Sequence, residues 1–148
     1  MAAIHKLLNG HVYNKTNKKV DLNDEEYEGM VFGLYFSAHW CGPCGEFTPK
    51  LVKFYNTYAE KKKFEIIFIS SDEDEESFKE YYKEMPWLTF DFKQKNKREK
   101  LEENLEVDGI PTLILIDGDS GEVICTDATE KISEEDPKGK DFPWHSDE

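Results

Sequence analysis

Two cysteines separated by two residues follow directly after an apolar run, and this pattern restricts the fold more than any other feature of the sequence. Cys41 and Cys44 lie in the segment Trp-Cys-Gly-Pro-Cys, behind the apolar residues 31–36. The apolar run predicts a buried strand, and residues 46–61 have the pattern of a helix. The cysteines are therefore expected where a helix begins. The free N–H groups and the dipole of a helix start stabilise a thiolate and lower its pKa, which favours thiol–disulfide exchange.

The two cysteines are expected to have different roles. Cys41 lies nearest the helix terminus and should be the exposed nucleophile, whereas Cys44 should be more buried and resolve the mixed disulfide. Pro43 has a fixed φ and no N–H group, so it stiffens the ring that the pair would close. The alternative is half of a zinc site. Because zinc needs about four ligands and the sequence has no second closely spaced Cys or His pair, the redox interpretation is favoured.

Composition narrows the class of protein further. The 148 residues are enough for one domain with a full core, and 32 acidic against 19 basic residues give a net charge of −13. This surface repels phosphate backbones and anionic lipid, so we expect no nucleic-acid and no membrane partner. Three cysteines are too few for a secreted disulfide framework, and no apolar run has the length of a membrane span. We therefore expect a cytoplasmic protein, with entry into the nucleus left open.

Apolar runs and turn residues predict an alternation of strands and helices. The order implies an α/β fold with a central mixed sheet and helices on both faces, in one domain over residues 1–148 that ends in a charged extension from about residue 131. Pro49 is expected to kink the helix after the cysteines or to force its restart. The other expected elements are short strands near 11–13 and 19–22, a strand at 64–69, a helix at 75–84 capped by Ser71-Asp72, a helix at 98–105, a strand at 113–116, a turn at 117–119 and a returning strand at 122–125.

A proline before the strand at 113–116 makes the pattern more specific. Pro111, in Ile110-Pro111-Thr112, would by itself be an ordinary strand-initiating proline. Together with the upstream Trp-Cys-Gly-Pro-Cys segment, it resembles the thioredoxin-fold family. In that family the proline at this position is cis and packs against the active-site disulfide, and the residue before it pairs with a substrate strand. The resemblance therefore implies that Pro111 lies against the disulfide and that Ile110 docks substrate.

A finer resemblance covers nearly the whole chain. The nucleoredoxin and tryparedoxin branch of the family is similar to this chain at Phe36-Ser37-Ala38, Phe47-Thr48-Pro49, residues 64–68, Glu76-Ser77-Phe78, residues 85–88 and residues 142–145. The chain departs from that branch in enclosing Gly-Pro, where its members usually have Pro-Pro, and in carrying Gly45 in place of an arginine. Like that branch, it has Tyr35 where ordinary thioredoxins place a buried aspartate. The redox tuning of the pair is therefore left open by the sequence.

The resemblance implies a thiol–disulfide oxidoreductase that reduces protein disulfides through Cys41 and Cys44. An external reductant, either a reductase flavoenzyme or a low-molecular-weight dithiol, would regenerate the dithiol, and no metal or bound organic cofactor is implied. The alternative is a redox-dependent interaction module for signalling or transcription-regulating partners. Both interpretations need Cys41, and the residues expected to bind substrate are Trp40, Gly42, Pro43, Ile110 and Pro111.

Several other residues allow two interpretations. Trp40 is expected to cover the disulfide at the docking surface, although a core tryptophan is about as plausible without the motif. His39 would stabilise a thiolate or, more simply, be a solvated neighbour, and Trp87 is expected in the core. Cys125 is expected as a buried small apolar residue, with a regulatory or dimer-forming thiol as the alternative. A basic cluster is expected to be a solvated loop and helix start rather than an import or docking patch: Lys93, Lys95, Lys97, Arg98 and Lys100.

Overall fold

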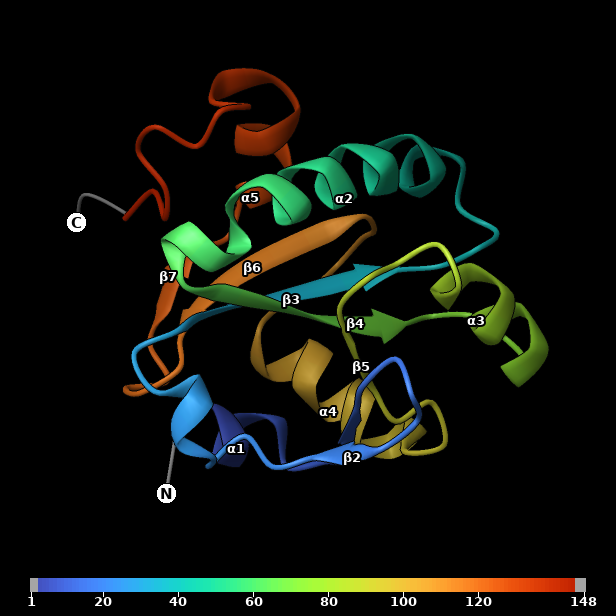
Figure 1. Ribbon diagram of the computed structural model, residues 1–148. Helices are drawn as coiled ribbons and strands as arrows, with labels where there is room; N and C mark the ends of the chain where they lie inside the picture. Colours follow the sequence, from blue (N-terminus) through green and yellow to red (C-terminus); the bar gives the residue numbers. More distant parts are fainter. Residues whose placement is uncertain (1–2, 146–148) are drawn as a thin grey trace.

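Seven strands form one mixed sheet in the computed structural model, which describes residues 3–145 (Figure 1). The strand order is β2-β1-β5-β4-β3-β6-β7, and the central strand β3 runs parallel to β4 and antiparallel to β6. The mixed sheet expected from the sequence is confirmed. The strands are β1 (Val12–Tyr13), β2 (Lys19–Val20), β3 (Val31–Ser37), β4 (Phe64–Ser70), β5 (Leu88–Phe90), β6 (Thr112–Asp117) and β7 (Val123–Cys125).

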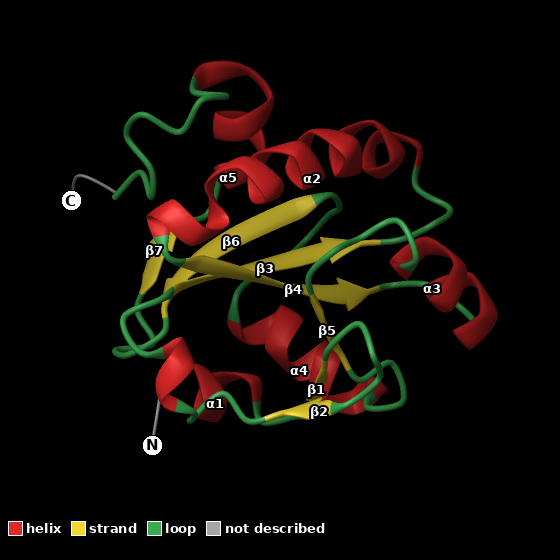
Figure 2. Ribbon diagram, viewed as in Figure 1, coloured by secondary structure: helices red, strands yellow, loops and turns green. Residues whose placement is uncertain are grey.

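Helices cover both faces of this sheet, as expected (Figure 2). On one face α2 and α3 bury Leu51, Phe54 and Phe78 against the sheet, and on the other α1 and α4 bury Ile4 and Leu101. With helices on both sides, β3 and β4 are buried almost throughout, which explains their continuous apolar sequences. The helices are α1 (Ala3–Leu8), α2 (Gly42–Lys62), α3 (Glu75–Tyr82), α4 (Lys95–Asn104) and α5 (Ala128–Glu130), with a 3-10 helix at Glu25–Tyr27 and a π-helix at Lys131–Glu135.

For the helices, the restart expected as one alternative at Pro49 is absent, and the expected cap of α3 is wrong. Helix α2 does not restart at Pro49 but runs unbroken through it to Lys62. A proline inside a helix costs about 3 kcal/mol, so the packing of the apolar face of α2 on the sheet must outweigh this cost. The cap of α3 is Asp74 rather than Ser71-Asp72, because Asp74 has an extended backbone and its carboxylate accepts the Ser77 N–H at 2.8 Å. Asp72 is instead buried and bonded elsewhere.

Some short elements have no counterpart in the sequence pattern. Helix α1 has six residues and β5 has three, which is too short for a periodic signal. Helix α4 begins at Lys95, three residues earlier than expected, with a first turn made of charged and polar residues. No helix in the described part of the chain combines the length and apolar character that a membrane span requires.

The C-terminal segment returns across α2 and contributes to the core. The Phe142 ring lies 4.9 Å from that of Phe64, and the Trp144 ring lies 6.1 Å from that of Phe54, measured between centroids. Ile132 is also buried in the same cluster. Figure 1 shows that both ends of the described chain lie at one end of the sheet, and that α2 begins at the opposite end.

Candidate active site

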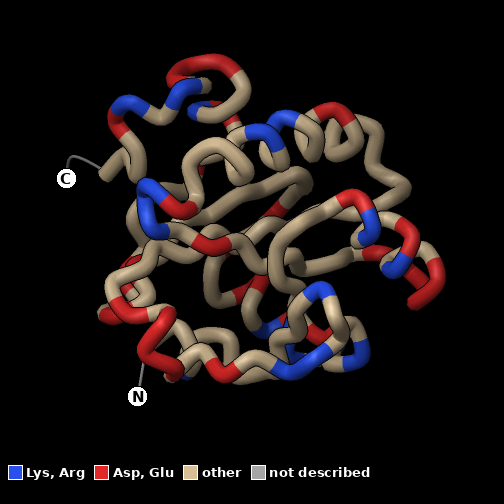
Figure 3. The backbone as a smooth tube through the Cα atoms, in the orientation of Figure 1, with Lys and Arg blue, Asp and Glu red and all other residues tan. Residues whose placement is uncertain are grey.

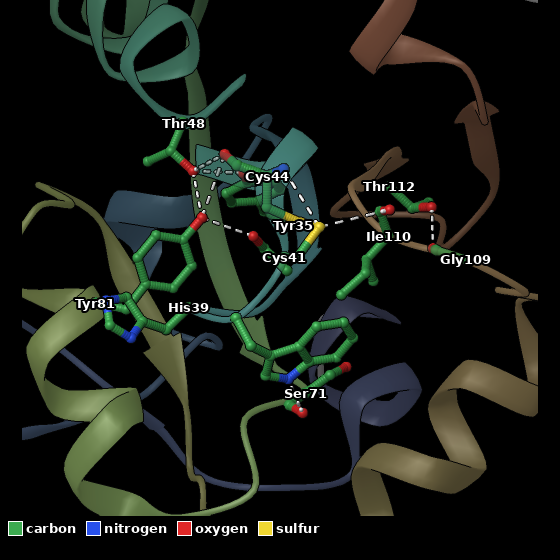
Figure 4. Close-up of a disulfide and its surroundings, with 12 residues drawn as sticks. Tyr35, His39, Cys41, Cys44, Thr48, Ser71, Tyr81, Gly109, Ile110 and Thr112 are labelled. Carbon is green, nitrogen blue, oxygen red and sulfur yellow. Dashed lines mark hydrogen bonds between the residues drawn. A yellow bond between two sulfur atoms is a disulfide. The ribbon is translucent and has the colours of Figure 1, made fainter. Parts of the chain in front are cut away.

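The two cysteines form a disulfide at the start of α2, just after the carboxyl end of β3 (Figure 4). Cys41 is the N-cap residue of the helix, and the backbone N–H of Cys44 donates to its Sγ at 3.3 Å. The side chain of Cys41 is 8% exposed and that of Cys44 is fully buried. The expected position at a helix start is confirmed, and Cys41 is the more accessible of the pair, but at 8% it is buried and not exposed as expected. An N–H group already directed at Cys41 Sγ would stabilise a thiolate there.

The loop before β6 meets the disulfide from the other side. The Ile110–Pro111 peptide bond is cis, as the resemblance implies, and Cys41 Sγ lies 3.9 Å from the carbonyl oxygen of Ile110. Ile110 and Pro111 are both half-buried. The Thr112 hydroxyl donates to the Gly109 carbonyl at 2.6 Å, which closes the turn around this peptide. The fold therefore brings together Cys41 and a backbone segment that lies far from it in sequence.

The surface beside the sulfurs is formed by the residues expected there. Trp40 is 63% exposed, so the alternative of a core tryptophan is wrong. Its indole Nε1–H donates to the Ser71 carbonyl at 3.3 Å, which holds the ring against the loop that follows β4. Gly42 and Pro43 are exposed as well. Trp87, in contrast, is 1% exposed and packs in the core, as expected.

Asp72 fixes the loop that carries Trp40. Its side chain is buried, with Oδ1 accepting the His39 N–H at 2.8 Å and Oδ2 accepting the Ser70 hydroxyl at 2.7 Å. The His39 side chain is exposed, and its ring packs 5.8 Å from that of Tyr81. The sequence interpretation missed this role because an Asp shortly before a helix also has the appearance of a cap. The available signal was that Ser70 and Asp72 come at the carboxyl end of β4, beside the end of β3.

A network of four buried hydroxyl groups lies behind Cys44. The Thr48 hydroxyl is 2.6 Å from both the Tyr35 and the Tyr81 hydroxyls, and it donates to the Cys44 carbonyl at 2.9 Å. The Tyr81 hydroxyl is also 2.8 Å from that of Ser37. Burial raises the pKa of the Tyr35 phenol, so that group is neutral near pH 7. At the position where ordinary thioredoxins have a buried aspartate, this chain has Tyr35 and its network of neutral hydroxyl groups.

Cys125 and the basic cluster lie outside this site. The thiol of Cys125 is buried and donates to Asp127 Oδ1 at 3.1 Å, and burial followed by this carboxylate raises its pKa to about 12. Within the basic cluster, Arg98 is partly buried and donates to the Ser70 carbonyl at 2.6 Å, while the four lysines are exposed. Among residues 3–145, a grouping of possible metal ligands is formed by the exposed carboxylates of Asp127, Glu130 and Glu135, and it includes neither sulfur of the disulfide.

Comparison with known proteins gives one consistent result. A family model described as thioredoxin-like matches residues 29–123. Tryparedoxin from Trypanosoma brucei brucei is 41% identical over 144 residues, which cover 97% of this chain and 99% of that protein. Nucleoredoxin from Homo sapiens is 44% identical over 131 residues, covering 87% of this chain but 29% of that protein. The chain thus spans nearly all of the tryparedoxin and less than a third of the nucleoredoxin.

Solved structures agree with this result. A tryparedoxin from Trypanosoma brucei superposes with a TM-score of 0.92 at 40% identity, covering 99% of this chain and all of that one. A tryparedoxin II in complex with glutathionylspermidine has a TM-score of 0.91 at 39% identity, over 97% of this chain and 99% of that one.

Proposed function

Since this chain belongs to the thioredoxin-like family, we propose that it is a thiol–disulfide oxidoreductase whose substrates are protein disulfides. Cys41 is the nucleophile of this reaction and Cys44 the resolving thiol. The observation that carries the proposal is the position of Cys41: its sulfur is the more accessible of the pair, accepts an N–H at a helix start and faces the Ile110 carbonyl.

The reaction begins with the reduced pair. The Cys41 thiolate attacks one sulfur of a substrate disulfide, and the other substrate sulfur leaves and takes up a proton. Cys44 then loses its proton and attacks Cys41 Sγ, which releases the second substrate sulfur as a thiol. The substrate has gained two electrons and two protons, and the enzyme carries the Cys41–Cys44 disulfide found in the structure.

Substrate binding is proposed to use the surface around the sulfurs. An extended substrate segment can pair with the backbone at Ile110, because this residue ends a loop beside Cys41 and is partly accessible. Pro111 keeps that backbone in place, and Trp40, Gly42 and Pro43 offer exposed contacts on the other side of the sulfurs. A buried Asp72 holds the Trp40 loop in position before substrate arrives.

For the reductant we propose a low-molecular-weight thiol that carries positive charge. A cavity of about 190 Å³ beside Trp40 is lined by Asp72, Glu73 and Asp74, which favours a cation near the disulfide. The tryparedoxin II complexed with glutathionylspermidine supports the same chemistry. Glutathionylspermidine should therefore reduce the disulfide faster than glutathione does, and the advantage should shrink as salt screens the charges. Equal rates for the two thiols at low salt would contradict this part of the proposal.

Turnover with an insulin disulfide substrate tests the function. Wild type should reduce insulin repeatedly when a reductant is supplied, and Cys41→Ser should lose this activity. Cys44→Ser should also lose turnover but hold substrate proteins as mixed disulfides on Cys41, which non-reducing gels followed by mass spectrometry detect. Cys125→Ser is the matched control and should keep wild-type turnover, because Cys125 lies outside the site.

The second candidate is a redox-dependent interaction module, which the 44% identity to nucleoredoxin from Homo sapiens supports. It needs Cys41 for binding partners but needs no turnover. Partner capture that persists in a protein with no multiple-turnover reduction by any reductant would favour this candidate over the enzyme. We place the protein in the cytoplasm under both proposals, with nuclear entry to be tested by imaging.

A further inference from the structure

A second cavity lies on the outer side of α2, where the C-terminal segment passes over the helix. Its volume is about 450 Å³, which is within the range of small-molecule sites in proteins. Neither Trp40 nor the two sulfurs line it, so it is separate from the redox site. The cavity is lined by Lys50, Lys53, Phe54, Thr57, Tyr58, Ile132, Ser133, Pro137 and Lys138.

The inner wall of the cavity is apolar. Phe54 is 3% exposed and Ile132 is 5% exposed, and both belong to the core cluster on this face of the sheet. The Tyr58 ring lies 5.0 Å from that of Phe54 and continues the wall toward solvent. An alkyl or aromatic group placed here would be removed from water, which is worth about 25 cal/mol for each Å² of apolar surface buried.

The charged residues that line the cavity are all basic. Lys50, Lys53 and Lys138 line it and no Asp or Glu does, although acidic residues outnumber basic ones in the chain as a whole. Within residues 3–145, none of these three ammonium groups makes an ion pair. Figure 3 shows basic positions on α2 and both basic and acidic positions on the C-terminal segment that passes over it.

Two neighbouring acidic side chains are engaged elsewhere. Both oxygens of Asp136 accept hydrogen bonds from the segment that follows it, from the Lys140 and Asp141 N–H groups and from the Trp144 indole. Glu135 pairs with Lys131 at 2.9 Å. Both carboxylates thus bond to partners other than the three lysines, and neither lines the cavity.

We propose that this cavity binds an amphipathic organic anion, a small molecule with an alkyl or aromatic body and a single acidic head group. The body lies against Phe54, Tyr58 and Ile132, and the head group faces the lysines at the rim. The charge of the lining disfavours a cationic ligand, and the volume suits a small molecule better than a protein segment.

Binding of anilinonaphthalene sulfonate to the full chain in its disulfide form tests the proposal. This probe combines an aromatic body with one sulfonate, and phenylnaphthylamine is a matched control with the same body and no charge. The sulfonate should bind at one saturable site, at least about tenfold more tightly than the neutral control, and less tightly at high salt. Amide shifts in NMR spectra should map to α2 and residues 132–138.

Charge-reversal variants locate the site. Replacing Lys50, Lys53 and Lys138 together by Glu should weaken sulfonate binding at least tenfold while leaving phenylnaphthylamine binding within about twofold. The matched control replaces three exposed lysines of α4, on the other face of the sheet, by Glu (Lys95, Lys97 and Lys100) and should bind the probe within about twofold of wild type. Thr57→Trp should obstruct the cavity and weaken both probes. Insulin reduction and thermal melting check that each variant is folded.

Three results would overturn the proposal. The first is an equal loss of sulfonate affinity in the cavity variant and in the control variant. The second is a set of amide shifts centred on Trp40 and Ile110, and the third is probe binding that does not saturate. The proposed function does not depend on these results, because insulin reduction is read separately.

Discussion

At the scale of single residues, Tyr81 connects α3 to the first turns of α2 through one hydroxyl group. That group is bonded to the Ser37 hydroxyl at the end of β3 and to the Thr48 hydroxyl, which in turn donates to the Cys44 carbonyl. Three elements are thus linked directly behind Cys44. Because the groups are buried, the loss of one partner leaves another without compensation from water.

Tyr81→Phe removes this link at nearly constant volume. We expect the free energy of unfolding to fall by about 1–3 kcal/mol, since buried hydroxyls lose a partner. Urea unfolding of the oxidised protein measures this change. Tyr58→Phe is the control, because no hydrogen bond of the Tyr58 hydroxyl is found within residues 3–145, and it should alter stability by less than about 0.5 kcal/mol. Equal effects of the two variants would argue against the network.

The third cysteine allows a test by chemical modification. Because burial and Asp127 raise the pKa of Cys125 to about 12, almost none of its thiol is ionised near pH 8. In the reduced, folded protein we expect iodoacetamide to modify Cys125 at least about a hundredfold more slowly than Cys41, and the difference to disappear in urea. Peptide mass spectrometry follows each site. Similar rates in the folded protein would restore the alternative of a reactive regulatory thiol.

At the scale of elements, strand β4 contains one carboxyl group, that of Glu65, and the folded protein disfavours its ionised form. Burial raises the pKa of Glu65 above its usual value, and the Tyr55 hydroxyl and the Ile66 N–H, which both donate to it, offset this only in part. A carboxyl with a raised pKa binds its proton more tightly in the folded state. Its contribution to stability is therefore present at low pH and is lost as pH rises through the titration of this group.

Glu65→Gln should remove this pH dependence. The amide oxygen can still accept from Tyr55 and Ile66, so we expect the variant to melt at a higher temperature than wild type near pH 7, with the difference shrinking toward about pH 4. Melting temperatures of both proteins, measured from about pH 4 to pH 7, test this expectation. Glu60→Gln on the exposed side of α2 should show no such trend. A gain that is the same at both pH values would contradict the assignment to ionisation.

The sequence predicted the long elements well because their patterns result from burial on both sides or on one face. The apolar runs of β3, β4 and β6 and the helical spacing of Leu51 and Phe54 left little choice. The prediction from sequence failed where one local pattern fits more than one structural role. Asp72 and Asp74 both precede α3, and only the position of the β3–α2 loop in space decides that Asp74 caps the helix while Asp72 anchors His39.

The candidate site, too, could be predicted from the sequence only in part. The pair Cys41 and Cys44 and the contact with Ile110 could be predicted, because spacing and resemblance together mark them. The roles of Thr48, Tyr81 and Ser37 could not, because three hydroxyls spread over three elements carry no spacing signal. Their meeting depends on how α3 packs against α2, which is a tertiary property.

At the scale of the whole molecule, the C-terminal segment is part of the packed fold. Trp144→Ala removes a ring that packs on Phe54 and Phe142 and an indole N–H bonded to Asp136. We expect this variant to lose about 3–5 kcal/mol of unfolding free energy, as large-to-small substitutions in cores do. Trp40→Ala makes the same chemical change at a 63% exposed site and should cost less than about 1 kcal/mol. Denaturant unfolding measures the loss of unfolding free energy in each variant. Equal losses would mean that the C-terminal segment is not packed as described.

The arrangement of the chain ends also has a practical consequence. Both ends of the described chain lie at the side of the sheet away from the start of α2 (Figure 1). A tag, a neighbouring domain or a solid support attached there would leave the sulfurs facing solution. If the protein is anchored to a resin or an electrode through either end, its sulfurs should therefore stay accessible to other proteins in solution.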